Sequence, residues 1–322
     1  MTVLILAQDA DAPTDHLVAE LTRRGVAVFR TDTSWFPRQL VLDAQLGPDG
    51  RWCGSLSTEH RSVRLSEIRS IWYRDPTAFT FAAGLTDVER AYAHREARLG
   101  FGGVLAALRG VTWANMPNRA ADAMYKPLQL ATAAACGLRV PPTLVTNSAA
   151  AVRRFAEVSD TGGVVQKSFG PNTVTEGGRT KVAYTRHLDD TALADLRGID
   201  ATATQLQGWV DKTSEARLVV VGDELFTIRI TASSAASRVD WRADFDALSY
   251  EWIDTPAEVA HGVRAYMKAL GLAYAALDFG IDRHDQFWFY ESNGGGQYGW
   301  LEAQTGAPIT LALADLLQGD RR

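Results

Sequence analysis

The segment Tyr290–Glu302, YESNGGGQYGWLE, holds two sets of residues whose types and spacing could perform chemistry. Its glycines match the G-x-G-x-x-G spacing of turns that bind dinucleotides, at Gly294, Gly296 and Gly299. Its oxygen-bearing side chains, Glu291 and Asn293, are of the kind that bind Mg²⁺. The two interpretations require different surroundings.

The surroundings disfavour a dinucleotide turn. Such a turn follows a strand, opens a helix and precedes a second strand that ends in an acid about 20 residues later. The next predicted helix, 309–317, does not begin at Gly299, and Asp320 lies in the polar tail LQGDRR, not at a strand end. The glycines are therefore interpreted as a loop that needs positive φ angles and lets the backbone bend close to a metal and phosphates.

Glu291 gains a partner from the preceding strand. Strand alternation places four residues on one face: Phe287, Phe289, Glu291 and Asn293. If Asp282 pairs with Phe287 across a four-residue loop, antiparallel register puts Asp278 directly opposite Glu291. Facing carboxylates destabilise a sheet unless a cation lies between them, which favours a Mg²⁺ site at Asp278, Glu291 and Asn293. Pairing of both acids with an arginine, or exposure of one acid to solvent, is the alternative.

Basic residues on predicted strands indicate an anionic ligand. Lys167 follows the apolar run VVQ at a strand end, which favours a function over the usual solvated position of lysine. Arg217 and Arg229 alternate with apolar residues along a hairpin that turns at 222–224. Arginines in apolar surroundings need an anionic partner, for which a triphosphate and a substrate carboxylate are the candidates.

Alternating strands and helices must position these side chains. The pattern strand, helix, strand at the N-terminus predicts an α/β unit, and hairpins dominate the C-terminal half. Strands or hairpins are predicted at 3–6, 26–30, 40–46, 51–57, 68–74, 141–146, 162–168, 206–210, 217–231 and 274–293, and helices at 16–25, 86–108, 120–137, 148–158, 256–271 and 309–317. Loops at 170–172 and 176–179 predict a small sheet with a lid.

Composition excludes several classes of protein. The 322 residues are 46% hydrophobic and 22% charged, as in globular proteins, and no apolar run reaches the roughly 20 residues that span a membrane. A net charge of −5 provides no field for nucleic acid, so no nucleic-acid or membrane partner is expected. The two cysteines, Cys53 and Cys136, lack metal-ligand spacing and predict free thiols in the cytoplasm.

Together these residues resemble the ATP-grasp superfamily. The resemblance rests on Lys126, which opens a helix that ends in CGLRVPPTLV, on VVQKSFG around Lys167, on LQGWVDKTSEARLVVVG (206–222), and on the acids with Asn293. Four further stretches narrow it: GVAVFRTDTSWFP (25–37), WYRDP (72–76), VDWR (239–242) and NGGGQYGWLEAQTGAPI (293–309). They resemble the ATP-grasp ribosomal peptide maturases of microviridin-like peptides (graspetides), including the grasp-with-spasm type. The chain departs from the family pattern at Gly208, where many relatives have an acid, and by lacking a proline after the asparagine.

The resemblance implies an α+β fold with three parts and a set of site residues. The parts are a pre-ATP-grasp α/β domain at 1–116, a central subdomain with the lid at 117–205, and a C-terminal subdomain with the metal site at 206–322. ATP and two Mg²⁺ ions are the implied cofactors. The implied ATP-binding residues are Lys126, Lys167, Gln207, Trp209, Val210, Asp211 and Lys212. The implied catalytic arginines are Arg217, Arg229 and Arg242, and the implied substrate contacts are Arg74, Thr173 and Tyr184. A core position for Trp209 and a plain surface position for Arg74 are the alternatives.

The implied function is that of an ADP-forming ligase. It would activate Asp or Glu side chains of a ribosomal precursor peptide as acyl phosphates and join them to Ser or Thr hydroxyls, or to Lys amines, to form macrocycles. The leader of the precursor would bind near 173–184, and the enzyme could be a homodimer. A ligase that adds a free amino acid to a peptide terminus, and a non-catalytic ATP-binding regulatory module, are the alternatives. Replacing Asp278 or Glu291 by its amide is expected to abolish turnover and to leave the fold intact.

Overall fold

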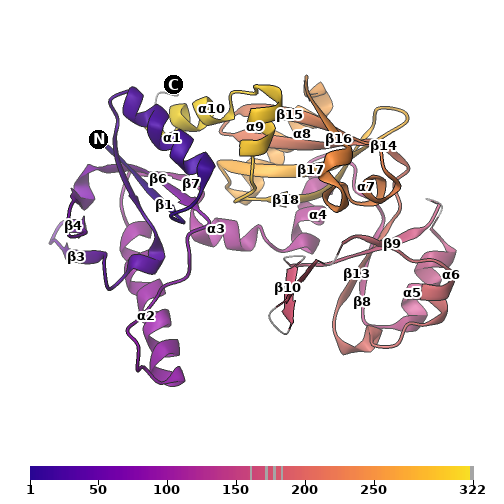
Figure 1. Cartoon of the computed structure of the whole chain (residues 1–322), viewed down its shortest axis with the longest axis horizontal. Coiled ribbons are helices and arrows are strands. Elements are labelled where there is room, and N and C mark those ends of the chain that lie inside the picture. The colour runs from indigo at the N-terminus through magenta and orange to yellow at the C-terminus, as the bar shows by residue number, and fades with distance from the viewer. Residues whose placement is uncertain (160–161, 171–172, 177–178, 183, 320–322) are drawn as a thin grey trace.

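The computed structural model describes residues 1–159, 162–170, 173–176, 179–182 and 184–319. It has the predicted α+β fold (Figure 1). The N-terminal part lies on the left of that view, the C-terminal sheet at the upper right and a small central sheet below it. Gly177 and Gly178 of the predicted lid, and Asp320, lie outside the described residues.

The N-terminal part confirms the predicted α/β unit. Its parallel sheet has the order β2-β1-β6-β7. The strands are β1 (Thr2–Ala7), β2 (Ala27–Thr31), β6 (Ile68–Arg74) and β7 (Thr112–Ala114), and the helices are α1 (Ala12–Arg23), η1 (Thr33–Trp35), η2 (Leu65–Glu67) and α2 (Asp87–Ala106). The predicted hairpin is present in a second sheet of β3 (Val41–Leu46), β4 (Trp52–Ser57) and β5 (Ser62–Arg64).

The region 120–137 forms two helices and not one, and the prediction that a helix opens at Lys126 is confirmed. Two helices occupy this region, α3 (Pro117–Asp122) and α4 (Lys126–Ala135). Pro127 lies in the first turn of α4, where its missing N–H costs no intrahelical hydrogen bond, so a continuous helix is broken just before Lys126. As a result Lys126 begins a helix that packs against β18 and α8 of the C-terminal part, while α3 lies beside the N-terminal part (Figure 1).

The central sheet has the order β12-β9-β13-β8 and a small core of its own. Its elements are β8 (Thr143–Thr146), α5 (Ala149–Glu157), β9 (Val164–Lys167), β12 (Arg186–His187), α6 (Asp190–Ala194), η3 (Ile199–Ala201) and β13 (Thr204–Gly208). A separate hairpin of β10 (Thr173–Glu176) and β11 (Arg179–Val182) extends from it. Because β13 pairs along its length with this sheet, the domain boundary predicted at 205/206 cuts a strand, and we propose a boundary after Gly208.

The C-terminal sheet has the order β16-β15-β14-β17-β18. Its elements are β14 (Lys212–Val221), β15 (Glu224–Ala232), α7 (Ala235–Val239), η4 (Trp241–Ala243), η5 (Phe245–Ala247), β16 (Leu248–Ile253), α8 (Ala257–Leu270), β17 (Tyr274–Asp282), β18 (Phe287–Asn293), α9 (Gly299–Thr305) and α10 (Ile309–Gln318). One face packs with α4 and α8. The other shares a continuous core with β1, β6, α1 and α10, so the N-terminal and C-terminal parts are joined by one apolar interior.

The glycine segment differs from the prediction in two ways. A short helix, α9, begins at Gly299, which the sequence analysis missed. None of Gly294, Gly295 and Gly296 has a positive φ angle, so that interpretation of the glycines is wrong. The dinucleotide turn remains excluded, because β18 pairs antiparallel at the sheet edge and no strand follows α9 in the described part of the chain.

Two further features concern membrane-spanning helices and cysteines. No helix in the described ranges is both long and apolar enough to cross a membrane. Cys53 and Cys136 are both free.

Candidate active site

The predicted carboxylate pair is present, although the register that produces it is not the predicted one. Asp278 lies opposite Glu291 on β17 and β18. The pairing nearer the turn joins Ile281 to Phe287, one residue away from the predicted Asp282, and a register shift next to Asp278 restores the acid pair. The extra residue in that shift is Tyr290, which has no ladder partner, as in a β-bulge.

The bulge changes which side chains share a face. Phe287 and Phe289 pack in the core beside Tyr266 of α8. The Ser292 hydroxyl forms a 2.6 Å hydrogen bond with the Tyr266 hydroxyl, so Ser292 points to the same side. The predicted common face of the two phenylalanines and Glu291 is therefore wrong, because one extra residue inverts the alternation of the strand.

Each acid is neutralised by cations from other elements. Arg217 on β14 donates from Nη1 to both Asp278 oxygens, at 2.8 and 2.9 Å. Glu291 contacts Lys126 Nζ at 2.6 Å and Arg242 Nη1 at 3.8 Å. Burial alone would raise the pKa of Glu291, but these cations outweigh it and hold that pKa below its usual value. The arginine pairing that stood as an alternative to a metal is thus present for Asp278.

The oxygen donors fit Mg²⁺. The Asp278 and Glu291 carboxylates face each other, and the Asn293 side-chain oxygen, which accepts a hydrogen bond from the Gly295 amide at 3.0 Å, is two residues further along the strand. No group of three or more His, Cys, Asp or Glu side chains with metal-binding geometry occurs among the described residues. Two carboxylates and an amide are an incomplete set, which suits Mg²⁺ because this ion keeps waters and substrate phosphates as its other ligands.

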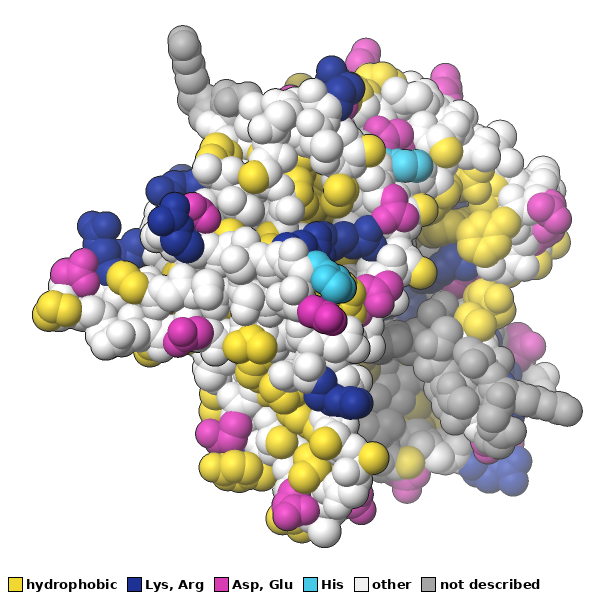
Figure 2. All heavy atoms as spheres, turned by 60° about the vertical axis from the view of Figure 1, so that its left-hand side comes forward, with side chains coloured by type: hydrophobic (Ala, Val, Ile, Leu, Met, Phe, Trp, Pro, Cys, Tyr) yellow, Lys and Arg dark blue, Asp and Glu magenta, His cyan; other side chains and the backbone are white. Residues whose placement is uncertain are grey.

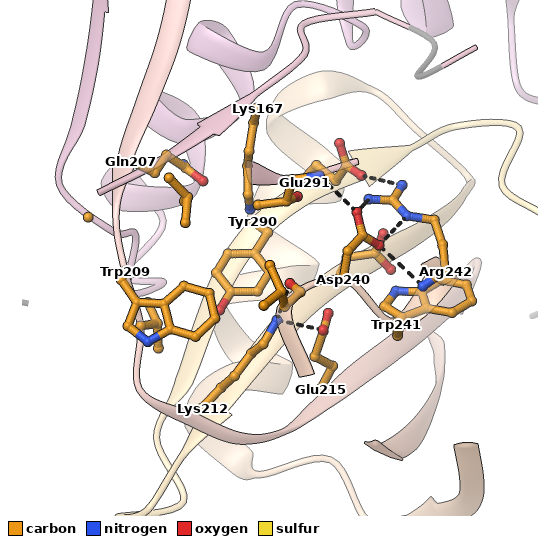
Figure 3. Close-up of a pocket in the computed structure, with 16 residues that line it drawn as sticks. Lys167, Gln207, Trp209, Lys212, Glu215, Asp240, Trp241, Arg242, Tyr290 and Glu291 are labelled. Carbon is orange, nitrogen blue, oxygen red and sulfur yellow. Dashed lines mark hydrogen bonds and ion pairs between the residues drawn. The ribbon is translucent and has the colours of Figure 1, made fainter. Parts of the chain in front are cut away.

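Two adjoining cavities lie between the central and C-terminal sheets. The larger has a volume of about 460 Å³ and reaches Lys126, Arg217 and both acids. The smaller has a volume of about 40 Å³ and is shown in Figure 3. Lys167, Tyr290 and Arg242 line both of them.

The smaller cavity collects most of the predicted ATP-binding residues. Its lining includes Gln207, Trp209, Val210 and Lys212. Figure 3 shows Gln207, Trp209 and Lys212 around one space. Asp211 is exposed and is absent from this lining, because the chain turns outward between β13 and β14. Trp209 is only partly buried and stacks near His187, at 4.6 Å between ring centroids, so it is a wall of the cavity and not a core residue.

A nucleotide base needs more room than this cavity provides. One side is closed by the segment that leads into η4, where Asp240 accepts a hydrogen bond from the Thr185 amide at 3.1 Å. Asp240 also binds Arg242 through Nε and Nη2, at 2.8 and 3.1 Å. Binding of a base therefore requires this segment to move away from β12.

The two predicted phosphate-binding lysines are in different states. Lys126 is committed to Glu291 and donates to the Ser168 carbonyl at 2.7 Å. The Lys167 ammonium lies 3.9 Å from the centroid of the Tyr290 ring, above its face. Burial lowers the pKa of Lys167 to about 8, so its charge is held less firmly than that of an ordinary lysine.

Two predicted site arginines lie elsewhere. Arg229 pairs with Ala216, so it points to the opposite face of the sheet from Arg217, and its partner is Glu251 at 3.7 Å. Arg74 is not a surface residue, because only 2% of it is exposed and Nη1 donates to the Gly295 carbonyl. In both cases the sequence pattern predicted an arginine on a strand, but it did not show which face of the strand the side chain would be on or what would pack against that face.

The predicted leader-binding segment is the β10–β11 hairpin. Thr173 pairs with Val182 in its ladder, and Tyr184 just beyond is 44% exposed. Tyr184 does not line the two cavities, so we propose that any substrate contact it makes lies outside them.

Comparisons with known proteins agree with this geometry. Residues 2–120 match the MvdD pre-ATP grasp domain. The macrocyclase MdnC of Microcystis aeruginosa MRC, solved with precursor peptide MdnA, is 26% identical, with a TM-score of 0.84 over 99% of this chain and 100% of that chain. The macrocyclase MdnB of the same organism is 27% identical, with a TM-score of 0.79 over 98% of each chain. Over its whole length the chain is similar to solved ATP-grasp peptide macrocyclases. The family resemblance inferred from the sequence is confirmed.

A third solved structure has the same fold. The RiPP-associated ATP-grasp ligase of Chryseobacterium gregarium, solved with ADP and with a leader and core peptide, is 24% identical, with a TM-score of 0.90 over 100% of this chain and 97% of that chain. No curated protein sequence matches the chain.

Three residues that line the site were missed by the sequence analysis. Glu215 lines the smaller cavity and contacts Lys212 Nζ at 2.6 Å, and burial raises its pKa. Its position two residues before Arg217, on the same strand face, could have indicated it. Tyr290 faces the cavity only because of the bulge, which no sequence signal predicted. Asp240 lies in the stretch VDWR (239–242) that carried the resemblance, but it was given no role there.

Proposed function

We propose that this chain is an ATP-dependent ligase that joins side chains of a ribosomal precursor peptide into macrocycles. The observation that carries the proposal is the larger cavity, which is lined from two sheets and brings Lys167, Arg217 and the Asp278–Glu291 pair around one space. Such a space can hold a triphosphate, a divalent ion and an acidic side chain together. The macrocyclase MdnC, which is similar over the full length, was solved with its precursor peptide.

The proposed reaction has two steps. A carboxylate oxygen of a substrate Asp or Glu attacks the γ-phosphorus of ATP, the bond to the ADP oxygen breaks, and an acyl phosphate forms. A Ser or Thr hydroxyl, or a Lys amine, then attacks the acyl carbon, phosphate leaves with the bonding electrons, and the attacking group loses its proton. The products are an ω-ester or an ω-amide, ADP and phosphate.

The side chains of the site serve these steps by position and charge. We propose that the base lies in the smaller cavity beside Gln207 and Trp209, after the Asp240 segment has moved. Lys167 then binds phosphate oxygens, and Arg217 and Arg242 stabilise charge on the transferred phosphoryl and acyl groups. Asp278, Glu291 and Asn293 would hold Mg²⁺, which supplies electrostatic stabilisation of the phosphates.

The precursor peptide is the proposed partner, with its leader on the β10–β11 hairpin.

We also propose a homodimer that forms through α2. This helix exposes Val88, Tyr92 and Leu99 by 80, 56 and 60%, and Figure 2 shows hydrophobic side chains on the projection that contains it. The helix also contains three glycines, Gly100, Gly102 and Gly103, and a Cβ added at any of them would meet no neighbour within 4 Å. Each glycine nevertheless destabilises the helix by about 1 kcal/mol relative to alanine. Close approach of a second helix would account for them, and Leu99→Glu should then convert a dimer to a monomer in light scattering.

A mass measurement tests the proposed function. The purified enzyme is incubated with ATP, Mg²⁺ and a precursor peptide encoded beside its gene, which should contain acids together with Thr, Ser or Lys. We expect the peptide to lose the mass of one water for each crosslink. A mass gain equal to an amino-acid residue would instead identify the amino-acid-adding ligase, and ATP binding without any change of peptide mass would identify a regulatory module.

A further inference from the structure

The loop that follows Asn293 is held by its backbone carbonyls. Four consecutive carbonyls, those of residues 294–297, each accept a hydrogen bond from a side chain outside the loop. The donors are Asn115 Nδ2 to Gly294 at 2.9 Å, Arg74 Nη1 to Gly295, Tyr274 hydroxyl to Gly296 at 2.5 Å, and Arg217 Nη2 to Gln297 at 3.4 Å. Burial raises the pKa of Tyr274 to about 12, so its hydroxyl remains a donor at neutral pH.

Two of these donors come from the N-terminal part. Arg74 ends β6, and Asn115 follows β7, the neighbouring parallel strand. Because parallel strands end at the same edge of a sheet, both side chains reach the loop from one edge. Each residue is only 2% exposed.

Asn115 also ties this edge to the start of β17. Its Nδ2 donates to the Tyr274 carbonyl at 2.7 Å, and its Oδ1 accepts from the amides of Ala273 and Tyr274 at 2.7 and 3.0 Å. All the hydrogen-bonding capacity of this amide is thus used between the loop and the strand that carries Asp278.

The loop itself has little freedom between these anchors. The Gly295 and Gly296 amides bond to the side chain and carbonyl of Asn293, at 3.0 and 3.1 Å. A Cβ on Gly296 would lie 2.4 Å from the Ala276 Cβ and 2.9 Å from Arg217 Nη2, so the backbone there lies against the site. Gly294 and Gln297 line the larger cavity.

We infer that Arg74 and Asn115 are positioning residues, through which the N-terminal domain sets the place of the loop 294–297 and of the Asn293 side chain bonded to it. Neither side chain lines the cavities, so each acts through the loop and not on the substrate. The inference rests on the proposed function for its catalytic consequence, but the anchoring of the loop can be measured without any reaction.

Arg74→Met is the first test. Two guanidinium nitrogens, Nε and Nη2, have no hydrogen-bond partner among the described residues, although Nε lies 3.5 Å from an Asp11 carboxylate oxygen. Methionine fills similar volume and removes the two unpaired nitrogens, and the Gly295 carbonyl that loses its donor is only partly buried, so the variant should fold. Arg74→Lys keeps a donor and should rescue part of the loss. Arg69→Met is the matched control, because Arg69 is on the same strand and exposed.

Hydrogen exchange and ligand binding are measured first, in the absence of precursor. We expect the amides of residues 294–297 to exchange at least about tenfold faster in Arg74→Met, whereas exchange in the core that joins the N-terminal and C-terminal parts should not change. We also expect that Mg²⁺ no longer strengthens ADP binding in this variant. Affinity for ADP without metal should change less than about twofold, because the base lies in the other cavity. Unchanged exchange in the loop, or faster exchange throughout the protein, would overturn the anchoring.

Measuring kcat with the precursor peptide tests the effect of the loop on catalysis. A loop displaced by about 1 Å can cost on the order of 100-fold in rate, so kcat should fall between tenfold and 100-fold while KM for ATP changes little. Wild-type kcat with a mobile loop would overturn the positioning role. If the wild-type enzyme leaves the precursor unchanged, the proposed function fails, and the exchange and Mg²⁺-linked ADP binding then decide the inference alone.

Discussion

Asp278 and Glu291 form one carboxylate pair, but the structure predicts that their amide variants differ in stability. The Asp278 side chain is 12% exposed and holds Arg217, which is 10% exposed. Asp278→Asn leaves that guanidinium buried and uncompensated, which costs about 3 to 5 kcal/mol. Glu291 is 25% exposed, and its partners keep other acceptors, the Ser168 carbonyl and Asp240, so Glu291→Gln should cost about 1 kcal/mol or less.

Thermal unfolding without nucleotide or metal measures this difference. At roughly 2 to 4 °C per kcal/mol, Asp278→Asn should lower Tm by roughly 6 °C or more, and Glu291→Gln by roughly 4 °C at most. Both variants should lose peptide modification, because each lacks a ligand for Mg²⁺. Equal Tm changes would refute the assignment of the buried ion pair, and full activity of either variant would refute the metal site. The sequence alone predicted an intact fold for both, because it could not show that Arg217 depends on Asp278.

Three further predictions concern the nucleotide and the glycines. Lys167 has a pKa lowered to about 8, so its positive charge is lost as pH rises through 8. In calorimetric titrations at fixed Mg²⁺, the affinity for ADP should therefore weaken as pH rises through 8. Lys167→Arg stays charged and should remove this pH dependence. A Cβ on Gly280 would lie 2.2 Å from the Tyr290 hydroxyl, so Gly280→Ala should displace the ring beneath Lys167 and raise the Kd for ADP severalfold, whereas an unchanged Kd would contradict the role of Tyr290. Gly296→Ala should displace Arg217 and lower kcat at least about tenfold, with a loss of about 1 to 3 kcal/mol in stability. Gly295→Ala is the control and should behave as wild type, because the nearest atom to its Cβ would be 3.9 Å away.

Local pattern identified most elements and the acid pair. The N-terminal strand, helix, strand unit and the long hairpins follow from alternation and helical periodicity, because each element buries one face of its own sequence. The pair Asp278 and Glu291 was found by ladder arithmetic from a turn that the structure places one residue away. The bulge at Tyr290 corrected that error, so the right pairing was reached through a wrong register.

Residues that act across the molecule were placed less well. Arg74 was predicted to meet substrate, whereas it is buried under the glycine loop. Arg229 was predicted beside Arg217, whereas the ladder turns it to the other face. Asn115 drew no attention, because nothing in a single asparagine indicates that two strands and a loop will meet around it.

The sequence by itself determined the family resemblance, the order of the elements, and the residue types that a nucleotide and a metal require, because motif spacing and alternation are properties of short segments. Only the tertiary structure decided which face each strand presents, which cation neutralises which acid, and which residues hold the loop beside the site. Those decisions depend on single-residue register shifts and on contacts between segments as distant as Arg74 and Gly295, which no local pattern encodes.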